Sequence, residues 1–286
     1  METIELAGDD GLRLVADVAG DPAAPPVVLF HGGGQTRHAW GTTLQVLSSN
    51  WRAYSVDLRG HGDSAWAPDG DYSLDAFARD VRAVARSLDQ PPALVGASLG
   101  GIASLTAIAE TEGAPLAIAL VLVDVAPRIE AAGVSRIGDF MKGNLDGFDS
   151  LEAVADAIGA YNPHRPRPKN LDGLKKNLRQ RADGRWMWHW DPRFVSGRFG
   201  SPDETRSTLV DGDRLQRAAR TLTIPTLLVR GRMSDLLSEE GARELLELVP
   251  HAQLADVAGA GHMVAGDRND AFNDAVVSFL SSVRPG

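Results

Sequence analysis

A serine within residues 94–101, LVGASLGG, has the setting that most clearly indicates chemistry. An apolar run leads into GASLGG, and a segment rich in Ala and Ile follows it. This order predicts a strand, a sharp turn and a helix, with Ser98 on the turn in a strained backbone conformation. Gly96 and Gly100 would let the strand and the helix pass closely. We therefore favour a nucleophilic Ser98 over a serine that only caps a helix.

A serine hydroxyl needs a base that accepts its proton and a carboxylate that orients the base. Among the seven histidines, His262 lies in a glycine-containing loop, GAGHM, after the last predicted strand and before the last predicted helix. A side chain there can reach over the sheet edge, so we expect His262 to be the base rather than a solvated loop residue. His31 and His61 are expected to brace nearby loops by hydrogen bonds, and His164 and His189 fall in an insertion.

Two aspartates follow predicted strands and could orient the histidine. Asp235 lies in RGRMSDLLS, and the order Ser98, Asp235, His262 is typical of hydrolases with a nucleophile on such a turn. Asp124, at the end of the preceding core strand, is the alternative acid, and its other possible role is to hold the following loop by local hydrogen bonds. The choice of Asp235 would be wrong if Asp124→Asn abolished turnover while Asp235→Asn preserved it.

Backbone N–H groups must bind the negative oxygen of the tetrahedral intermediate. One candidate is the N–H of Leu99, directly after the nucleophile and at a helix N-terminus. The other comes from the segment His31-Gly32-Gly33-Gly34, and we expect it to be the N–H of Gly33, because glycines leave their N–H groups unobstructed. These glycines could also form a tight turn without a chemical role.

The candidate substrate pocket rests on Gly34, Met263 and the tryptophans of the segment RWMWHWD, which are Trp186, Trp188 and Trp190. Aromatic residues in an insertion often only pack against the core, and they can also form the wall of an apolar pocket. Both interpretations stay open. The basic loop at residues 165–169 is expected to be a solvated turn rather than a clamp for an acidic substrate.

The elements that must position these residues alternate between strands and helices. Apolar runs that are hydrophobic on both faces predict a parallel sheet covered on both sides. Strands are predicted at residues 3–6, 12–18, 27–30, 53–56, 93–95, 116–123, 223–229 and 252–257, and helices at 40–47, 74–88, 102–109, 239–248 and 271–283. Between them, residues 127–215 lack buried-strand runs but contain helical pieces at 137–141, 151–158 and 171–178. We expect a core formed by residues 1–126 and 216–286, with a mostly helical lid at 127–215.

Composition excludes several classes of function. The 286 residues are 43% hydrophobic, so the chain can build a full core, and its net charge of −9 disfavours nucleic acids and anionic membrane surfaces as partners. It has no cysteine, which excludes a thiol nucleophile. No metal or nucleotide motif is present, so no cofactor is expected. Without a secretory pattern or a run of about 20 apolar residues, we expect a cytoplasmic protein, and a monomer and a homo-oligomer both stay open.

The segments LFHGGG, DLRGHGDS, LVGASLGG, LVLVD, LLVRGRMSD and AGHM together resemble the α/β-hydrolase superfamily along nearly the whole chain. The resemblance implies a mostly parallel eight-stranded sheet flanked by helices, with a helical lid inserted after the sixth strand. Within the superfamily, the chain is similar to a group that includes bacterial esterases, cofactor-free haloperoxidases (perhydrolases), carbon-carbon bond hydrolases and epoxide hydrolases. Epoxide hydrolases and haloalkane dehalogenases carry aspartate where this chain has Ser98, so their chemistry is not expected.

The expected function is hydrolysis of small, largely apolar carboxylic esters through an acyl-enzyme intermediate. Ser98, His262 and Asp235 would form the triad, and activity would fall at acidic pH as His262 is protonated. A carbon-carbon bond hydrolase, a lactonase and a perhydrolase could use the same residues. A ligand receptor built on this fold, with negligible turnover, is the alternative of a different class.

Overall fold

The computed structural model describes residues 1–161, 167, 170–199, 211–261 and 269–285. Its main sheet has eight strands in the order β1-β2-β4-β3-β5-β6-β9-β10. Their bounds are β1 (Glu2–Ala7), β2 (Arg13–Ala19), β3 (Pro26–Phe30), β4 (Arg52–Val56), β5 (Ala93–Ala97), β6 (Ala119–Val123), β9 (Thr226–Gly231) and β10 (Gln253–Val257). β2 runs antiparallel to β1 and to β4, and every other pair in the sheet is parallel. The expected mostly parallel, eight-stranded sheet is confirmed.

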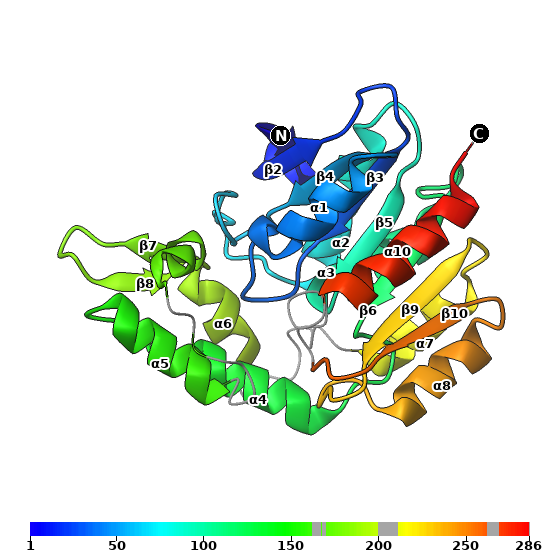
Figure 1. The fold of residues 1–286 in the computed structure, drawn as a ribbon. Coiled ribbons are helices and arrows are strands. Elements are labelled where there is room, and N and C mark those ends of the chain that lie inside the picture. The colour runs from blue at the N-terminus through cyan, green and yellow to red at the C-terminus, as the bar shows by residue number, and fades with distance from the viewer. Residues whose placement is uncertain (162–166, 168–169, 200–210, 262–268, 286) are drawn as a thin grey trace.

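Helices cover both faces of the sheet (Figure 1). Along β3, Val28 and Phe30 face one hydrophobic cluster, and Val27 and Leu29 face the other. This alternation explains why the strand is apolar at every position. The first cluster includes side chains of α2 (Leu74–Arg86), α3 (Leu99–Ala109), α7 (Gly212–Arg220) and α8 (Glu239–Leu248), and the second those of α1 (Gly41–Leu47) and α10 (Asn269–Val283).

The chain leaves the sheet between β6 and α7, and we call the described residues 127–199 the insertion. Its elements are α4 (Ala131–Lys142), α5 (Leu151–Tyr161), the 3₁₀ helix η3 (Asp172–Asn177), β7 (Leu178–Gln180), β8 (Trp186–Trp188) and α6 (Pro192–Phe199). In Figure 1 they lie to one side of the sheet. The predicted boundary at residue 215 falls within α7, whose Arg214 is paired with Glu110 at the end of α3.

Part of the insertion differs from the expected helices. The helix expected at residues 171–178 is a short 3₁₀ helix followed by β7, which pairs with β8 as a hairpin. Asp183-Gly184 lies in the connection, where Gly184 has φ +86°, and β8 carries tryptophans at alternate positions. These are the signals of a hairpin, because Asp-Gly favours tight turns and aromatic residues favour strands.

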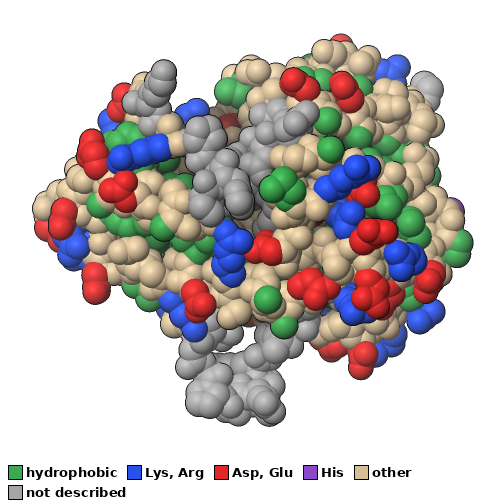
Figure 2. All heavy atoms as spheres, turned by 60° about the horizontal axis from the view of Figure 1, so that its bottom comes forward, with side chains coloured by type: hydrophobic (Ala, Val, Ile, Leu, Met, Phe, Trp, Pro, Cys, Tyr) green, Lys and Arg blue, Asp and Glu red, His purple; other side chains and the backbone are tan. Residues whose placement is uncertain are grey.

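The outer surface carries charges of both signs. Figure 2 shows acidic and basic side chains interspersed over one face of the molecule. Among the described residues, no helix is both long and apolar enough to span a bilayer.

Candidate functional site

Ser98 lies on a strained turn between β5 and α3. Its φ of +46° and ψ of −112° lie in a region that residues with a side chain rarely adopt. The glycines around it are required by close packing, because a Cβ on Gly100 would lie 2.3 Å from the carbonyl oxygen of Phe30. A Cβ on Gly96 would lie 2.5 Å from the backbone of Gly100. The Ser98 side chain makes no capping hydrogen bond to α3, so its position is not explained as a helix cap.

A glycine turn after β3 lies against the nucleophile. The Gln35 N–H donates to the Gly32 carbonyl at 3.1 Å and closes the turn, and Gly34 has φ +75°, which favours glycine. A Cβ built on Gly32 would lie 3.4 Å from the Cβ of Ser98. The turn expected to hold the oxyanion donor is therefore next to Ser98.

Two of the three glycine N–H groups in this turn already donate a hydrogen bond. Gly32 donates to Gln35 Oε1 at 2.9 Å, and Gly34 donates to His61 Nε2 at 3.1 Å. Within the described part of the chain, the N–H groups of Gly33 and Leu99 have no hydrogen-bond partner. Two backbone donors, one in the glycine turn next to Ser98 and one directly after Ser98 in the chain, thus remain available to a substrate oxygen.

Two histidines brace this region by hydrogen bonds, as the sequence predicts. His31 is buried, and its Nε2 accepts from the Leu58 N–H at 3.0 Å, so the proton is on Nδ1, which donates to the Gly32 carbonyl at 2.8 Å. Burial lowers the pKa of His31, which keeps the ring neutral and preserves this tautomer. His61 donates from Nδ1 to the Arg59 carbonyl at 2.9 Å and accepts from Gly34.

A third histidine reaches the same turn from the insertion. His189 Nδ1 accepts from the Gly62 N–H at 2.7 Å, and its Nε2–H donates to the Gly34 carbonyl at 3.3 Å. Burial lowers the pKa of His189 to about 3. The sequence placed His189 in the insertion but gave no sign of this contact, because nothing local to residue 189 marks which loop it will touch.

The buried His189 should make the protein less stable in mild acid. The unfolded chain binds a proton at His189 below about pH 6.5, whereas the folded chain does so only near pH 3. The contribution of neutral His189 to the free energy of unfolding is therefore fully present above pH 6.5 and falls as the pH drops. At pH 5 it is lower by about 2 kcal/mol. Urea unfolding near pH 8 and pH 5 measures the difference. His189→Gln should show a smaller loss between the two pH values, and the exposed His251→Gln should behave as wild type; equal losses in all three proteins would contradict the assignment.

Buried charges anchor the far side of the glycine turn. Arg37, in the 3₁₀ helix η2 (Arg37–Trp40), contacts the carboxylate of Asp57 and pairs with Asp17 at 3.0 Å and with Asp63 at 2.8 Å. Burial alone would lower the pKa of Arg37, but the surrounding carboxylates, led by Asp57, raise it, so the guanidinium stays charged. This network fixes the path of the chain after Gln35, and no motif in the sequence predicts it.

Asp124 follows β6 as Ser98 follows β5. The two strands are in register at Ala97 and Val123, and the Ser98 N–H donates to the Val123 carbonyl at 3.1 Å, so Asp124 is one position past a neighbouring strand end. Its side chain is fully buried and accepts from the Gly231 N–H at 2.9 Å and from Ser234 Oγ at 2.5 Å. Its φ of +51° is a second strained conformation at the carboxyl ends of these strands.

Asp235, the acid that the sequence favoured, has a different environment. Its side chain is 42% exposed and forms an ion pair of 2.6 Å with Arg136 of α4. The same guanidinium also donates to the carbonyl of Tyr161. Asp235 therefore connects the loop after β9 to the insertion, whereas Asp124 is the buried carboxylate beside the Ser98 turn.

His262 and Met263 lie outside the described residues. The chain that leads to His262 is described as far as Gly261, and it runs along the end of β9. The Met233 N–H donates to the Ala260 carbonyl at 2.9 Å, and a Cβ on Gly231 would lie 2.3 Å from the Gly261 carbonyl. Because the Gly231 N–H binds Asp124, Gly261 and the Asp124 carboxylate both lie next to Gly231.

The tryptophans of the insertion are mainly packed among aromatic side chains. Trp188 and Trp190 are buried and stacked, with ring centroids 4.9 Å apart and planes at 12°. A Cβ on Gly34 would lie 3.4 Å from Trp190 and 3.2 Å from Met141. Trp190 and Met141 therefore border the glycine turn, while Trp186 is half-buried in β8.

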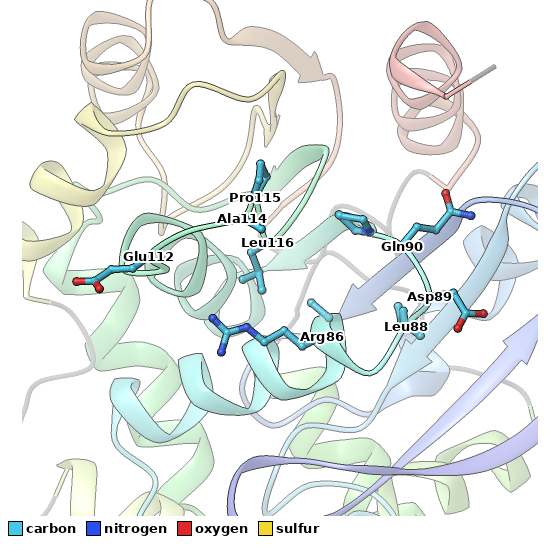
Figure 3. A pocket seen from close by; sticks show the side chains of 10 residues that line it. Arg86, Leu88, Asp89, Gln90, Glu112, Ala114, Pro115 and Leu116 are labelled. Atoms are coloured by element: carbon cyan, nitrogen blue, oxygen red, sulfur yellow. The ribbon is translucent and has the colours of Figure 1, made fainter.

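A surface hollow elsewhere is distinct from this site. It is lined by the end of α2 and by the loops that precede β5 and β6, including Arg86, Asp89 and Glu112 (Figure 3). Those loops lie at the amino ends of β5 and β6, whereas Ser98 and Asp124 follow their carboxyl ends. Among the described residues, no group of His, Asp and Glu side chains is arranged to hold a metal ion.

The chain is similar to known hydrolases in sequence and in structure. A model of the alpha/beta hydrolase family matches residues 27–275. The chain is 33% identical over 270 residues to Esterase Rv0045c of Mycobacterium tuberculosis, covering 91% of this chain and 84% of that protein. It is 30% identical over 255 residues to a 3-hydroxybutyrate-oligomer hydrolase of Cupriavidus necator, covering 85% and 84%. A solved structure of the M. tuberculosis esterase matches with a TM-score of 0.76 and 28% identity, covering 98% of this chain and 92% of that one.

Proposed function

The chain belongs to the α/β-hydrolase family, and we propose that it is a serine esterase acting on small, largely apolar carboxylic esters. The observation that carries the proposal is the strained Ser98 beside two unoccupied backbone donors, the N–H groups of Gly33 and Leu99. A nucleophile next to preorganised donors is suited to acyl transfer, because the donors stabilise the charge that develops on the carbonyl oxygen. Each such donor typically contributes about 3 kcal/mol to the transition state.

In the proposed mechanism, Ser98 Oγ attacks the ester carbonyl while His262 accepts the hydroxyl proton. The carbonyl oxygen becomes negative and is bound by Gly33 and Leu99. Collapse of this intermediate breaks the bond to the alcohol, which leaves with the proton from His262. Water then attacks the acyl-enzyme and gives a proton to His262. The bond between the acyl carbon and Ser98 Oγ breaks, His262 returns the proton to Oγ, and the acid is released.

We assign the orienting carboxylate to Asp124 in place of Asp235. The support is its burial, its register beside Ser98 and its bond to Gly231, against which the chain runs immediately before His262. A buried carboxylate stabilises an imidazolium more strongly than an exposed one, since water screens the exposed charge. Asp235 is the weaker candidate because it is exposed and already paired with Arg136.

The proposed substrate class is supported by the names of two relatives and by the side chains next to the glycine turn. The two relatives described above are named as an esterase and a 3-hydroxybutyrate-oligomer hydrolase. Trp190 and Met141 provide an apolar border at Gly34, which favours an apolar acyl group. Because both residues belong to the insertion, we propose that the insertion acts as the lid over the acyl site.

The direct test combines turnover with covalent labelling. We expect p-nitrophenyl acetate and butyrate to be hydrolysed with an initial burst of one p-nitrophenolate per enzyme, and a fluorophosphonate to label Ser98. Binding of these esters without turnover or labelling would instead indicate a ligand receptor. Three other results would replace the esterase assignment with the corresponding activity. These are faster hydrolysis of lactones, faster hydrolysis of a carbon-carbon bond in a diketone, and peroxide-dependent oxidation in the presence of a short carboxylic acid.

A further inference from the structure

We propose that Gln35 is a positioning residue for the oxyanion hole, a role that rests on the proposed esterase function. Gln35 forms hydrogen bonds with both backbone groups of Gly32. Its side-chain Oε1 accepts from the Gly32 N–H at 2.9 Å, and its backbone N–H donates to the Gly32 carbonyl at 3.1 Å. The next N–H along the chain, that of Gly33, is the unoccupied donor beside the nucleophile.

The geometry of the peptide plane explains how Gln35 acts on Gly33. The Gly32 carbonyl and the Gly33 N–H belong to one planar peptide and point in opposite directions. The carbonyl accepts from His31 Nδ1 at 2.8 Å as well as from the Gln35 N–H. Fixing the N–H and the carbonyl of Gly32 together restricts both of its backbone torsions, and so fixes the direction of the Gly33 N–H.

Such a restraint matters because residues 32–34 are all glycine. Glycine has wide conformational freedom, so an unrestrained turn would present the Gly33 N–H in many directions. The Gln35 side chain is also at the right place, since a Cβ on Gly32 would be 3.0 Å from Gln35 Oε1 and 3.4 Å from Ser98 Cβ. The Gln35 amide and the nucleophile thus flank the same residue.

A neutral acceptor suits this place better than a charged one. A carboxylate could accept the same hydrogen bond from Gly32, but its negative charge would lie near the negative oxygen of the intermediate. Glutamine therefore holds the turn without opposing the charge that develops in the transition state.

The test compares Gln35→Met with Gln35→Glu and with a matched control. Methionine keeps the approximate length but removes the acceptor, so we expect kcat for a p-nitrophenyl ester to fall about 10- to 100-fold with KM changed less than about threefold. The affinity for phenylboronic acid, whose adduct with Ser98 is tetrahedral and negative, should weaken by a similar factor. Gln35→Glu should also lose kcat. Gln45→Met, at an exposed position of α1, should match wild type.

The results distinguish a failure of the positioning role of Gln35 from a failure of the proposed esterase function. If the wild type hydrolyses the ester and binds the boronic acid, but Gln35→Met retains both within about twofold, the positioning role is wrong and the esterase assignment stands. If KM rises while kcat and boronic-acid affinity are unchanged, Gln35 contacts substrate instead, which also overturns the proposal. A wild type with neither activity nor boronic-acid binding would refute the esterase function itself. A circular dichroism spectrum and melting temperature for each variant show whether it is folded.

Discussion

Replacing Ser98 with alanine is expected to lower kcat for p-nitrophenyl esters by about 10⁴-fold or more, because removal of a serine nucleophile leaves only binding and oxyanion stabilisation. The substitution removes one hydroxyl that makes no capping bond to α3, so the fold should be retained. Steady-state kinetics on the purified variant, with a circular dichroism control, measure the effect. Residual activity above about 10% of wild type would show that Ser98 is not the nucleophile.

The strained conformation of Ser98 gives this prediction a second readout. A side chain at φ +46° costs free energy that glycine does not experience. Ser98→Gly should therefore be as inactive as Ser98→Ala, yet more stable by about 1 kcal/mol in urea unfolding. If the glycine variant were the less stable of the two, the strain at the turn would not be a feature of the folded protein in solution.

The second large effect is expected at Asp124. Asp124→Asn should lower kcat by about 10⁴-fold, because an amide in place of the carboxylate favours the wrong tautomer of the catalytic histidine. Asparagine can still accept from the Gly231 N–H, but its amide NH₂ would face Ser234 Oγ, which already accepts from the Leu236 and Leu237 N–H groups, so urea unfolding of the variant accompanies the kinetics. The kinetics are to be measured near pH 8, where the buried histidines do not destabilise the protein.

Asp235→Asn is the matched control, since it makes the same chemical change at the other aspartate. The pair that Asp235 forms with Arg136 is exposed, so its loss should change the unfolding free energy by about 0.5 kcal/mol or less and leave kcat within a few-fold of wild type. The opposite pattern, with Asp235→Asn inactive and Asp124→Asn active, would restore Asp235 as the acid, as expected from the sequence.

Asp124 and Asp235 both follow buried strands, and both give the order serine, aspartate, histidine with Ser98 and His262. The order along the chain therefore does not separate them, although the interpretation of the sequence chose Asp235. The distinction comes from register: Asp124 is one position past Val123, which pairs with Ala97 beside the nucleophile. Asp235 is four residues beyond the end of β9, which is far enough for the loop to carry it to the surface and to Arg136. Loop paths depend on contacts with distant segments, and these are not encoded in the local pattern.

The strands of the main sheet, the Ser98 turn and the glycine turn at residues 32–34 could be predicted from local sequence. Apolar periodicity and the backbone freedom of glycine are local properties, and they act wherever the residues occur. Three-dimensional contacts select the carboxylate that is buried beside Ser98, and they leave Gly33 as the unoccupied donor of the turn, because Gln35 and His61 accept from the N–H groups of Gly32 and Gly34. Hydrogen bonds between residues as distant as His189 and Gly34 form only after the sheet and the insertion have brought them together, because each bond requires a separation of about 3 Å.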